Sequence, residues 1–368
     1  MWPYFAMVGV PMFLSALGHS TNLNQKNLNY KFNKSVINAF FFIWLVLLCF
    51  RSITVGIDLY NYRDMFMRFS GYSLRQIFSF SKETEIEIGY VLLSKFTSLF
   101  TSNFHWQIII VAIISVVPIW KMYKADDSIF PFLTIVLFLN LGLFSIYFSA
   151  LRQVLAMTFC VPVYKYTKEK RFLLCMLMVA CAFLFHKSAI VLLLFYPIYH
   201  LRLKKQWHFF FILPIVAILY IFRSTIFNVL VALLEEVSDR YSGSAGSTGA
   251  YSMFLLLLIL TAFAFFIPDH SNTDAETVGL RNILVLSLII QIFAGVHSLA
   301  MRMNYYYLIF IPLLIPKIIQ GSSEKNRSLI RLALLVMLSF FTFFYFYKAY
   351  TDADILQVYP YIPFWRTT

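Results

Sequence analysis

The chain has 368 residues, of which 60% are hydrophobic and only 13% are charged, and its mean hydropathy is +0.75. These values lie outside the range of soluble globular domains and predict an integral membrane protein. The net charge of +13 comes from short cationic clusters between apolar runs. That pattern is typical of membrane orientation and argues against nucleic acid as a partner.

Most apolar runs continue for roughly 15 to 20 residues, which favours helices over the alternating strands of a barrel. We therefore expect an all-α, polytopic membrane helical bundle that forms a single integral membrane domain over residues 1–368. Lys and Arg clusters mark the inner side and predict about twelve crossings with both ends of the chain outside. The predicted crossings are residues 2–18, 36–50, 104–120, 130–148, 154–164, 172–185, 189–199, 207–222, 251–267, 282–299, 305–315 and 329–347.

Two polar segments, residues 52–88 and 224–250, are predicted to be outer loops. The second ends in the run G-S-A-G-S-T-G-A, whose composition is typical of a flexible loop. Residues 89–100 are amphipathic and interrupted by Lys95. We expect them to form an outer re-entrant or interfacial helix and not a crossing.

Four ionisable residues return to one predicted level near the outer boundary: Arg51, Arg152, His186 and Arg302. Each lies about 20–25 Å from the cationic cluster at the other end of its helix, at roughly 1.5 Å per residue. The hydrocarbon core is about 30 Å thick, so a charge at that depth needs a partner or a watery cavity. The pattern predicts an outer site that these residues share.

The hairpin from S-A-L-R-Q to F-H-K-S-A supplies the first candidates. Arg152 and Gln153 open a helix, and a guanidinium fork there suits a diphosphate or carboxylate. The alternative for Arg152 is an arginine that snorkels to the headgroups. His186, followed by Ser188 in a tight turn, suits a general base or a phosphate ligand. Its alternative is a histidine hydrogen-bonded to a neighbouring helix.

The first outer segment supplies two carboxylates and a tyrosine. Asp58 and Tyr62 share one helical face, where the carboxylate would face the cavity beside Arg51 and the tyrosine would contact a sugar. The alternative for Asp58 is a helix cap. Glu87, in E-I-G-Y at the start of the re-entrant helix, is the second carboxylate.

The motif M-R-M-N-Y-Y-Y brings Arg302 and Tyr305 to the predicted outer end of a late helix. Like Arg152, Arg302 is a candidate for binding an anionic group of the substrate. Tyr305 is a candidate substrate contact. The alternative for the tyrosines is an aromatic belt at the membrane interface.

No metal site and no cofactor are predicted. The four cysteines all fall inside apolar runs, without a C-x-x-C pair or a neighbouring histidine at ligand spacing. The chain also lacks the nucleotide-binding, serine-hydrolase and zinc-protease fingerprints.

Taken in order, R-S-I-T-V-G-I-D-L-Y-N-Y-R-D-M-F, E-I-G-Y, L-R-Q-V-L-A, F-H-K-S-A, M-R-M-N-Y-Y and the Y-P-Y tail resemble the EpsG family. These are Wzy-like multi-pass polymerases of bacterial capsule, exopolysaccharide and O-antigen pathways. The resemblance runs from Arg51 to the end of the chain, with departures at Leu59 and Ile88 that remove no functional group. The motif residues that carry over are Arg51, Asp58, Tyr62, Glu87, Gly89, Arg152, Gln153, His186, Ser188 and Arg302.

The resemblance implies a GT-C-like membrane fold and a metal-independent, inverting glycosyltransferase. Such an enzyme joins undecaprenyl-diphosphate-linked repeat units at the outer face of the bacterial inner membrane, so its site faces the periplasm. Arg152 and Arg302 would hold the diphosphate. Asp58, Glu87 or His186 would activate the acceptor hydroxyl, and the sequence does not rank these three.

The expected partners are the undecaprenyl-diphosphate-linked glycan, membrane lipid and a chain-length co-polymerase. Two alternative functions stay open. One is a flippase or transporter of lipid-linked oligosaccharides, although a transporter would place its ionisable residues near the midplane. The other is an O-antigen-ligase-like transferase, which would share the outer cavity.

Overall fold

The computed structural model describes residues 2–20, 26–126, 130–202, 212–232, 250–266, 274–322, 324–351 and 357–366. Over these residues the protein is helical and contains no β-strand, which confirms the predicted all-α class. The chain forms two compact units, Met1–Ile190 with Leu329–Thr368, and Val191–Ser328. The single membrane domain stays a prediction.

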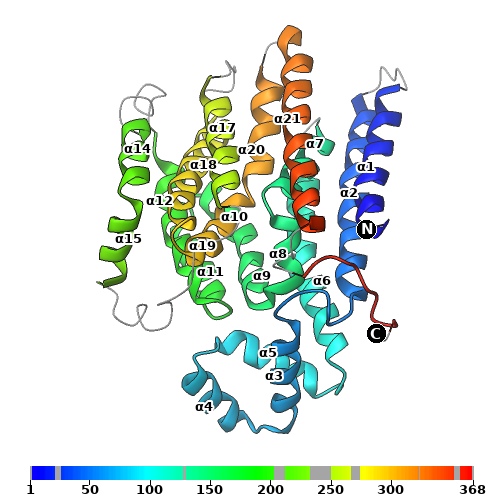
Figure 1. Cartoon of the computed structure of the whole chain (residues 1–368), viewed down its shortest axis with the longest axis vertical. Helices are drawn as coiled ribbons and strands as arrows, with labels where there is room; N and C mark the ends of the chain where they lie inside the picture. Colours follow the sequence, from blue (N-terminus) through cyan, green and yellow to red (C-terminus); the bar gives the residue numbers. More distant parts are fainter. Residues whose placement is uncertain are drawn as a thin grey trace. The chain divides into compact units, whose positions relative to one another are not determined.

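The first unit holds the N-terminal helices, the first outer segment and most of the C-terminal helix (Figure 1). Its helices are α1 (Trp2–Ser20), α2 (Lys26–Phe50), α3 (Leu59–Gly71), α4 (Leu74–Thr84), α5 (Ile88–Ser98), α6 (Phe104–Ala125), α7 (Pro131–Asn140), α8 (Leu143–Ser149), α9 (Leu151–Thr158), α10 (Cys160–Lys168), α11 (Phe172–Phe183) and α21 (Glu324–Thr351). The 3₁₀ helix η1 (Lys187–Leu194) begins in this unit and ends in the second.

Aromatic side chains fill the core between α2, α6 and α7. Phe41 and Trp44 of α2 are fully buried, and both pack edge-on against Phe138 of α7. Phe41 also stacks on Tyr123 of α6 at a centroid distance of 5.6 Å. Such large, rigid rings bury much apolar area and hold the three helices in register.

The second unit contains α12 (Phe195–His200), α14 (Leu213–Ile221), α15 (Arg223–Ala232), α17 (Ala250–Phe266), α18 (Ala275–Ala294), α19 (Ser298–Leu308) and α20 (Ile311–Gly321). At one end of this unit, Ala250, Ala294 and Ala300 form a buried cluster. Small side chains let helices approach closely, which is how membrane helices commonly pack.

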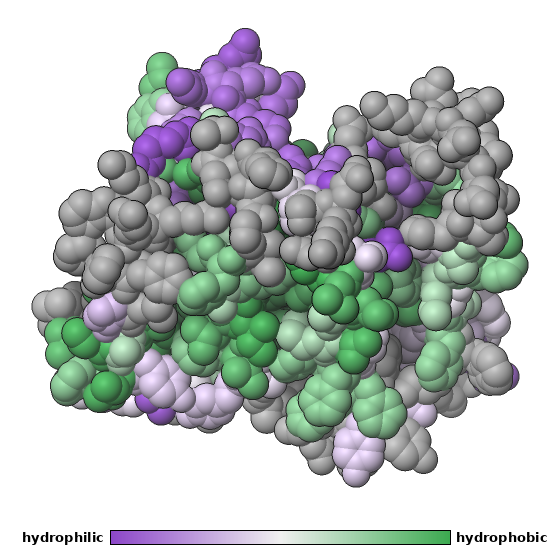
Figure 2. Space-filling model, turned by 90° about the horizontal axis from the view of Figure 1, so that it is seen from above, coloured by the Kyte–Doolittle hydropathy of each residue, from purple (hydrophilic) through white to green (hydrophobic). Residues whose placement is uncertain are grey.

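Four helical stretches are long and apolar enough to cross a membrane: Phe32–Phe50, Phe104–Ala125, Ala275–Ala294 and Arg327–Phe344. The number rises to six if each of two bent helix pairs is one span. Figure 2 shows apolar side chains over much of the face that it presents. The multi-pass membrane architecture is therefore confirmed, while the number of about twelve crossings stays a prediction.

The structure breaks two predicted crossings of the first unit, and in the second unit it bends the predicted crossing 305–315 by 48° between α19 and α20. The predicted helix 130–148 is bent by 54° between α7 and α8, at Leu141 and Gly142. Gly142 has φ 69°, a left-handed conformation that favours glycine and ends a straight helix. The predicted helix 154–164 is likewise divided between α9 and α10.

A further difference concerns the turn before M-R-M-N-Y-Y-Y. We predicted a crossing up to residue 299, but α18 ends at Ala294 and α19 begins at Ser298. The His297 side chain accepts a hydrogen bond from the N–H of Leu299 at 3.0 Å and caps α19. Hydropathy does not reveal that a histidine caps a helix. The chain therefore turns before residue 299, where the predicted crossing ends.

The first outer segment, predicted as a loop, is largely helical. Ser73 and Gln76 form a capping box that starts α4. Phe69, Ile77 and Val91 then join α3, α4 and α5 through a small buried core. In Figure 1 these three helices lie together beyond one end of α2 and α6. The helix predicted at 89–100 is α5, whereas the run at 243–250 lies outside the described residues except for Ala250.

Candidate functional site

Glu87 occupies the link between α4 and α5. Two residues earlier, Glu85 ends α4 in the left-handed region, with φ 54°. Glu87 has the N-cap position of α5, yet its side chain makes no capping hydrogen bond. The carboxylate of Glu87 is therefore left to bind other parts of the chain.

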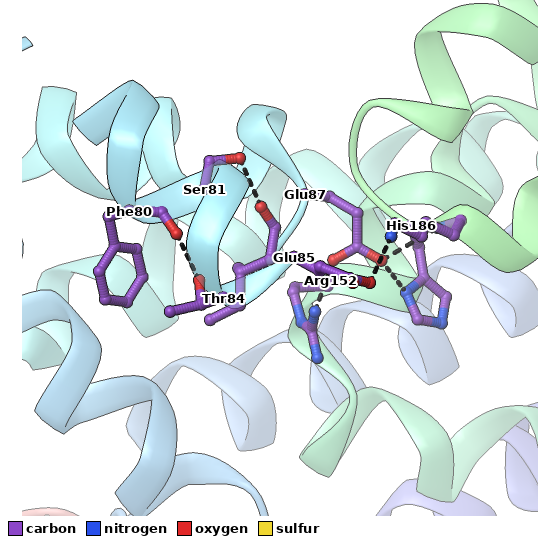
Figure 3. Close-up of polar contacts among 9 residues, drawn as sticks. Phe80, Ser81, Thr84, Glu85, Glu87, Arg152 and His186 are labelled. Atoms are coloured by element: carbon purple, nitrogen blue, oxygen red, sulfur yellow. Dashed lines mark hydrogen bonds and ion pairs between the residues drawn. The ribbon is translucent and has the colours of Figure 1, made fainter. Parts of the chain in front are cut away.

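That carboxylate joins two distant motifs (Figure 3). One oxygen accepts from Nη1 of Arg152 at 2.5 Å. The other lies 2.9 Å from Nδ1 of His186 and accepts from the backbone N–H of Lys187 at 3.0 Å. We call Glu87, Arg152 and His186 the Glu87 cluster.

The members of the Glu87 cluster differ in exposure. The Glu87 side chain is 5% exposed, that of His186 14% and that of Arg152 26%. The Nε atom of Arg152 is buried and has no hydrogen-bond partner within the described chain. The acid thus lies innermost, while the two basic side chains keep exposed surface for a ligand.

The environment of Glu87 holds it in the ionised form. Burial alone would raise its pKa, but the hydrogen bond from His186, the charge of Arg152 and the Lys187 amide outweigh burial. Together they lower the pKa of Glu87 to about 2. Near neutral pH the carboxylate is charged and fully engaged.

Gly89 allows α5 to come close to the turn that carries His186. Its N–H donates to the carbonyl of Leu184 at 2.8 Å. A Cβ on Gly89 would lie 2.7 Å from that same oxygen, a distance that real Cβ atoms essentially never show. Glycine is therefore required here for the pairing of E-I-G-Y with F-H-K-S-A.

Tyr62 lies beside Arg152. Tyr62 is buried on α3, and its ring centre lies 6.0 Å from the guanidinium carbon of Arg152. Its ring also packs against that of Tyr90, with 5.1 Å between the ring centres. Burial raises the pKa of the Tyr62 hydroxyl, while Arg152 opposes that shift and Asp58 adds to it. Asp58 is thus near enough to act on Tyr62, and it makes no side-chain cap on α3.

Three further candidates of the first unit are buried. Gln153 follows Arg152 in α9, and Ser188 lies in η1, two residues after His186. Arg51 is 1% exposed, and its Nη1 donates to the Tyr147 carbonyl at 3.1 Å. None of the ion pairs in the described ranges gives Arg51 a carboxylate partner, so its predicted place beside Asp58 stays a prediction.

The two remaining candidates lie in the second unit. Arg302 is an exposed residue near the start of α19, and Tyr305 is buried in the same helix. Their roles as substrate contacts stay predictions. Among the described residues, no group of three or more His, Cys, Asp or Glu side chains is placed to hold a metal ion.

Sequence reasoning missed the contribution of Lys187. Its backbone N–H binds Glu87, and its Nζ forms an exposed ion pair with Glu85 at 3.0 Å. The backbone contact has no sequence signal, because any residue except proline offers an N–H.

We compared the chain with curated proteins, solved structures and protein-family profiles. No curated protein and no solved structure matches the chain. The sequence profile of the EpsG family, however, matches residues 34–362. That match covers nearly the whole chain and includes all three members of the Glu87 cluster. The protein therefore belongs to the EpsG family of polysaccharide polymerase-like membrane proteins.

Proposed function

We propose that this protein is a Wzy-type polymerase that joins undecaprenyl-diphosphate-linked repeat units at the outer face of the bacterial inner membrane. The observation that carries the proposal is the Glu87 cluster. It brings the arginine of L-R-Q and the histidine of F-H-K-S-A, from separate family motifs, to one carboxylate.

Arg152 is assigned to the diphosphate of the donor. One of its nitrogens is fixed by Glu87, while the buried Nε has no partner within the described chain. An anchored guanidinium is a strong, directional ligand for phosphate oxygens. Its charge would stabilise the diphosphate as it departs, and the proposal therefore invokes no resident metal.

His186 is assigned as the general base. An ionised carboxylate can only accept hydrogen bonds, so Nδ1 of His186 carries the hydrogen in the bond to Glu87. Nε2 of the neutral ring is then free to accept a proton. Both oxygens of Glu87 are already engaged by Arg152, His186 and the Lys187 amide, which also lower its pKa, so Glu87 acts as a positioning residue.

The proposed step is a direct displacement. The acceptor sugar hydroxyl attacks the anomeric carbon of the donor glycan, and its proton passes to Nε2 of His186. The bond from that carbon to the diphosphate oxygen breaks, and the electron pair leaves with undecaprenyl diphosphate. Attack from the face opposite to the leaving group inverts the anomeric centre. The roles of Asp58, Tyr62, Gln153 and Ser188 toward the sugars stay predictions.

The test of the proposal uses cells that make the polymer. Deletion should leave single lipid-linked repeat units at the outer face, and complementation with wild type should restore long chains. Arg152→Lys and His186→Gln, at wild-type protein level, should not restore them. Long polymer from either variant would contradict its assigned role. Repeat units trapped at the inner face would indicate a flippase, and long polymer that stays on undecaprenyl diphosphate would indicate a ligase.

The outward orientation of the site can be tested separately. Lys187 is adjacent to His186, and half of its side chain is exposed. A Lys187→Cys variant in otherwise cysteine-free protein should react with a membrane-impermeant maleimide in spheroplasts. Reaction only after the inner membrane is permeabilised would place the site on the inner side. Co-purification with a chain-length co-polymerase would test that partner.

A further inference from the structure

The C-terminal segment, residues 357–366, pairs with residues 50–56 after α2. Both belong to the first unit, and in Figure 1 the tail runs beside the end of α2. Three backbone hydrogen bonds join them: Ser52 N–H to Ile362 O (2.8 Å), Phe364 N–H to Phe50 O (2.9 Å) and Gly56 N–H to Gln357 O (2.9 Å). The Y-P-Y motif therefore has a structural place that the proposed reaction does not use.

Side chains tie the same segment to three helices. The Tyr361 hydroxyl donates to the Leu47 carbonyl of α2 at 3.1 Å. The Tyr4 hydroxyl of α1 donates to the carbonyl of Val358 at 2.5 Å. The Phe364 ring stacks on His105 of α6 at 4.1 Å. The tail is thus held at several points and forms part of the fold.

Residues 50–56 in turn support the end of α8. Arg51 donates to the Tyr147 carbonyl, and its guanidinium carbon lies 5.2 Å from the centre of the Phe148 ring. Gly56 has φ +126°, and a Cβ there would lie 2.0 Å from the Phe148 carbonyl oxygen. The backbone of the two segments is therefore in direct contact, which only glycine permits.

The end of α8 leads directly to Arg152. Ala150 closes α8 through its N–H to the Ile146 carbonyl and accepts from the N–H of Val154 in α9, each at 3.0 Å. α9 begins at Leu151, so Arg152 stands in its first turn. A shift at Tyr147 would therefore move the guanidinium relative to Glu87.

The environment of Arg51 suits support and not substrate contact. The side chain is 1% exposed, and in the described ranges it has no acidic partner. A flat guanidinium can bind a carbonyl at its edge and an aromatic ring at its face, which an ammonium group does less well. At 1% exposure, the side chain offers almost no surface to a ligand.

We propose that Arg51 is a positioning residue for Arg152, and that residues 357–366 hold Arg51 in place. The inference rests on the proposed function insofar as Arg152 binds the donor diphosphate. It revises the role predicted for Arg51, from substrate contact to support of the α8–α9 junction. On this proposal, the C-terminal segment also helps to position Arg152.

The first experiment does not depend on activity. Hydrogen exchange is compared between the full chain, a chain ended at residue 356 and full-length Arg51→Met, all in detergent. Both changes should accelerate exchange over residues 147–156 and leave residues 250–266 of α17 unaffected. Unchanged exchange at 147–156 in Arg51→Met would overturn the inference. This variant decides the matter if the shortened chain does not fold.

The second experiment measures coupling to Arg152. The substrate is lipid-linked repeat units purified from cells that lack the protein, and the variants are Arg51→Met, Arg152→Lys and the double variant. Each single change should lower kcat, by as much as about 100-fold for a shift of about 1 Å. The double variant should be about as slow as the worse single, because both act through one group.

Arg63→Met is the matched control, since Arg63 is an exposed arginine that pairs with its neighbour Asp64. Independent, multiplicative effects of the Arg51 and Arg152 changes would overturn the inference. So would a raised KM with unchanged kcat in Arg51→Met, which would place Arg51 on the substrate. If wild type itself forms no polymer, the proposed function fails, while the exchange experiment still decides the role of Arg51.

Discussion

The Glu87 cluster of the first unit and an amide network of the second unit both join separate helices through polar side chains. In the network, Asn304 of α19 accepts from Ser287 at 2.7 Å and donates to Gln291 at 2.8 Å, both in α18. Gln291 donates onward to the Ala250 carbonyl of α17 at 3.1 Å. All three side chains are buried and neutral.

The Glu87 cluster and the amide network differ in charge and in how much of their side chains remains exposed to a ligand. The network is completely buried, and its side chains bind one another and the backbone. The Glu87 cluster instead concentrates charge on one buried acid and leaves its two basic members partly exposed. A closed neutral network suits a structural role, whereas charged groups with spare donors suit ligand binding.

Removal of the Glu87 charge should have the largest effect. In Glu87→Gln, Arg152 and His186 lose their common counter-charge and their orientation. Breaking a buried ion pair costs about 3–5 kcal/mol, which corresponds to roughly 150- to 5,000-fold in rate when the whole cost falls on the transition state. Polymerisation should therefore fall by about 100-fold or more. The rate is measured on purified repeat units, with exposed Glu83→Gln of α4 as the control. A wild-type rate in Glu87→Gln would remove the cluster from the site.

Acid should erase the stability that Glu87 contributes. Its folded pKa of about 2 lies below its ordinary value of 4.5, so the contribution is complete above about pH 4.5 and disappears as the pH falls through 2. The shift corresponds to about 3 kcal/mol. Thermal unfolding of wild type and Glu87→Gln should therefore converge between pH 4.5 and 2. A difference that persists unchanged at pH 2 would contradict this.

An added methyl group at Gly89 should separate the motifs without changing any charge. In Gly89→Ala the new Cβ meets the Leu184 backbone, which costs about 1–3 kcal/mol and displaces Glu87 from His186. Gly71→Ala is the control, because its Cβ would meet nothing within 4 Å. Melting temperature and polymerisation rate should both fall in Gly89→Ala. Neither should change in Gly71→Ala.

The amide network should respond through stability alone. Asn304→Ala leaves Ser287 and Gln291 without their shared partner, at a cost of about 1–3 kcal/mol. The melting temperature should fall by a similar amount at every pH from 5 to 8, since no member of the network is charged. A strongly pH-dependent loss would show that the network differs less from the Glu87 cluster than we infer.

The smallest effect should come from the exposed ion pair beside the cluster. Glu85→Gln removes the charge that pairs with Lys187, and both side chains are about half exposed. Such pairs contribute about 0–1 kcal/mol, so the rate and melting temperature should remain near wild type. A loss as large as that of Glu87→Gln would mean that the second ion pair also belongs to the site.

The candidate residues could be named from the sequence, but not the contacts that pair them. Helical rise alone places Arg152 and His186 near one level, and the family motifs point to Glu87 and Asp58 as carboxylates. Glu87 is 65 residues from Arg152 and 99 from His186. No local pattern carries contacts of that range, so the choice between the two acids had to come from the folded chain.

The sequence by itself determined the membrane class, the helical fold, the family and most of the candidate residues. These follow from hydropathy, from the spacing of cations and from motifs, which are all local properties of the chain. The tertiary structure decided that Glu87 binds both Arg152 and His186, that His297 caps the helix after the turn into α19, and that the tail pairs with the segment that carries Arg51. Each of these depends on side chains and carbonyls from distant segments, whose meeting is a property of packing.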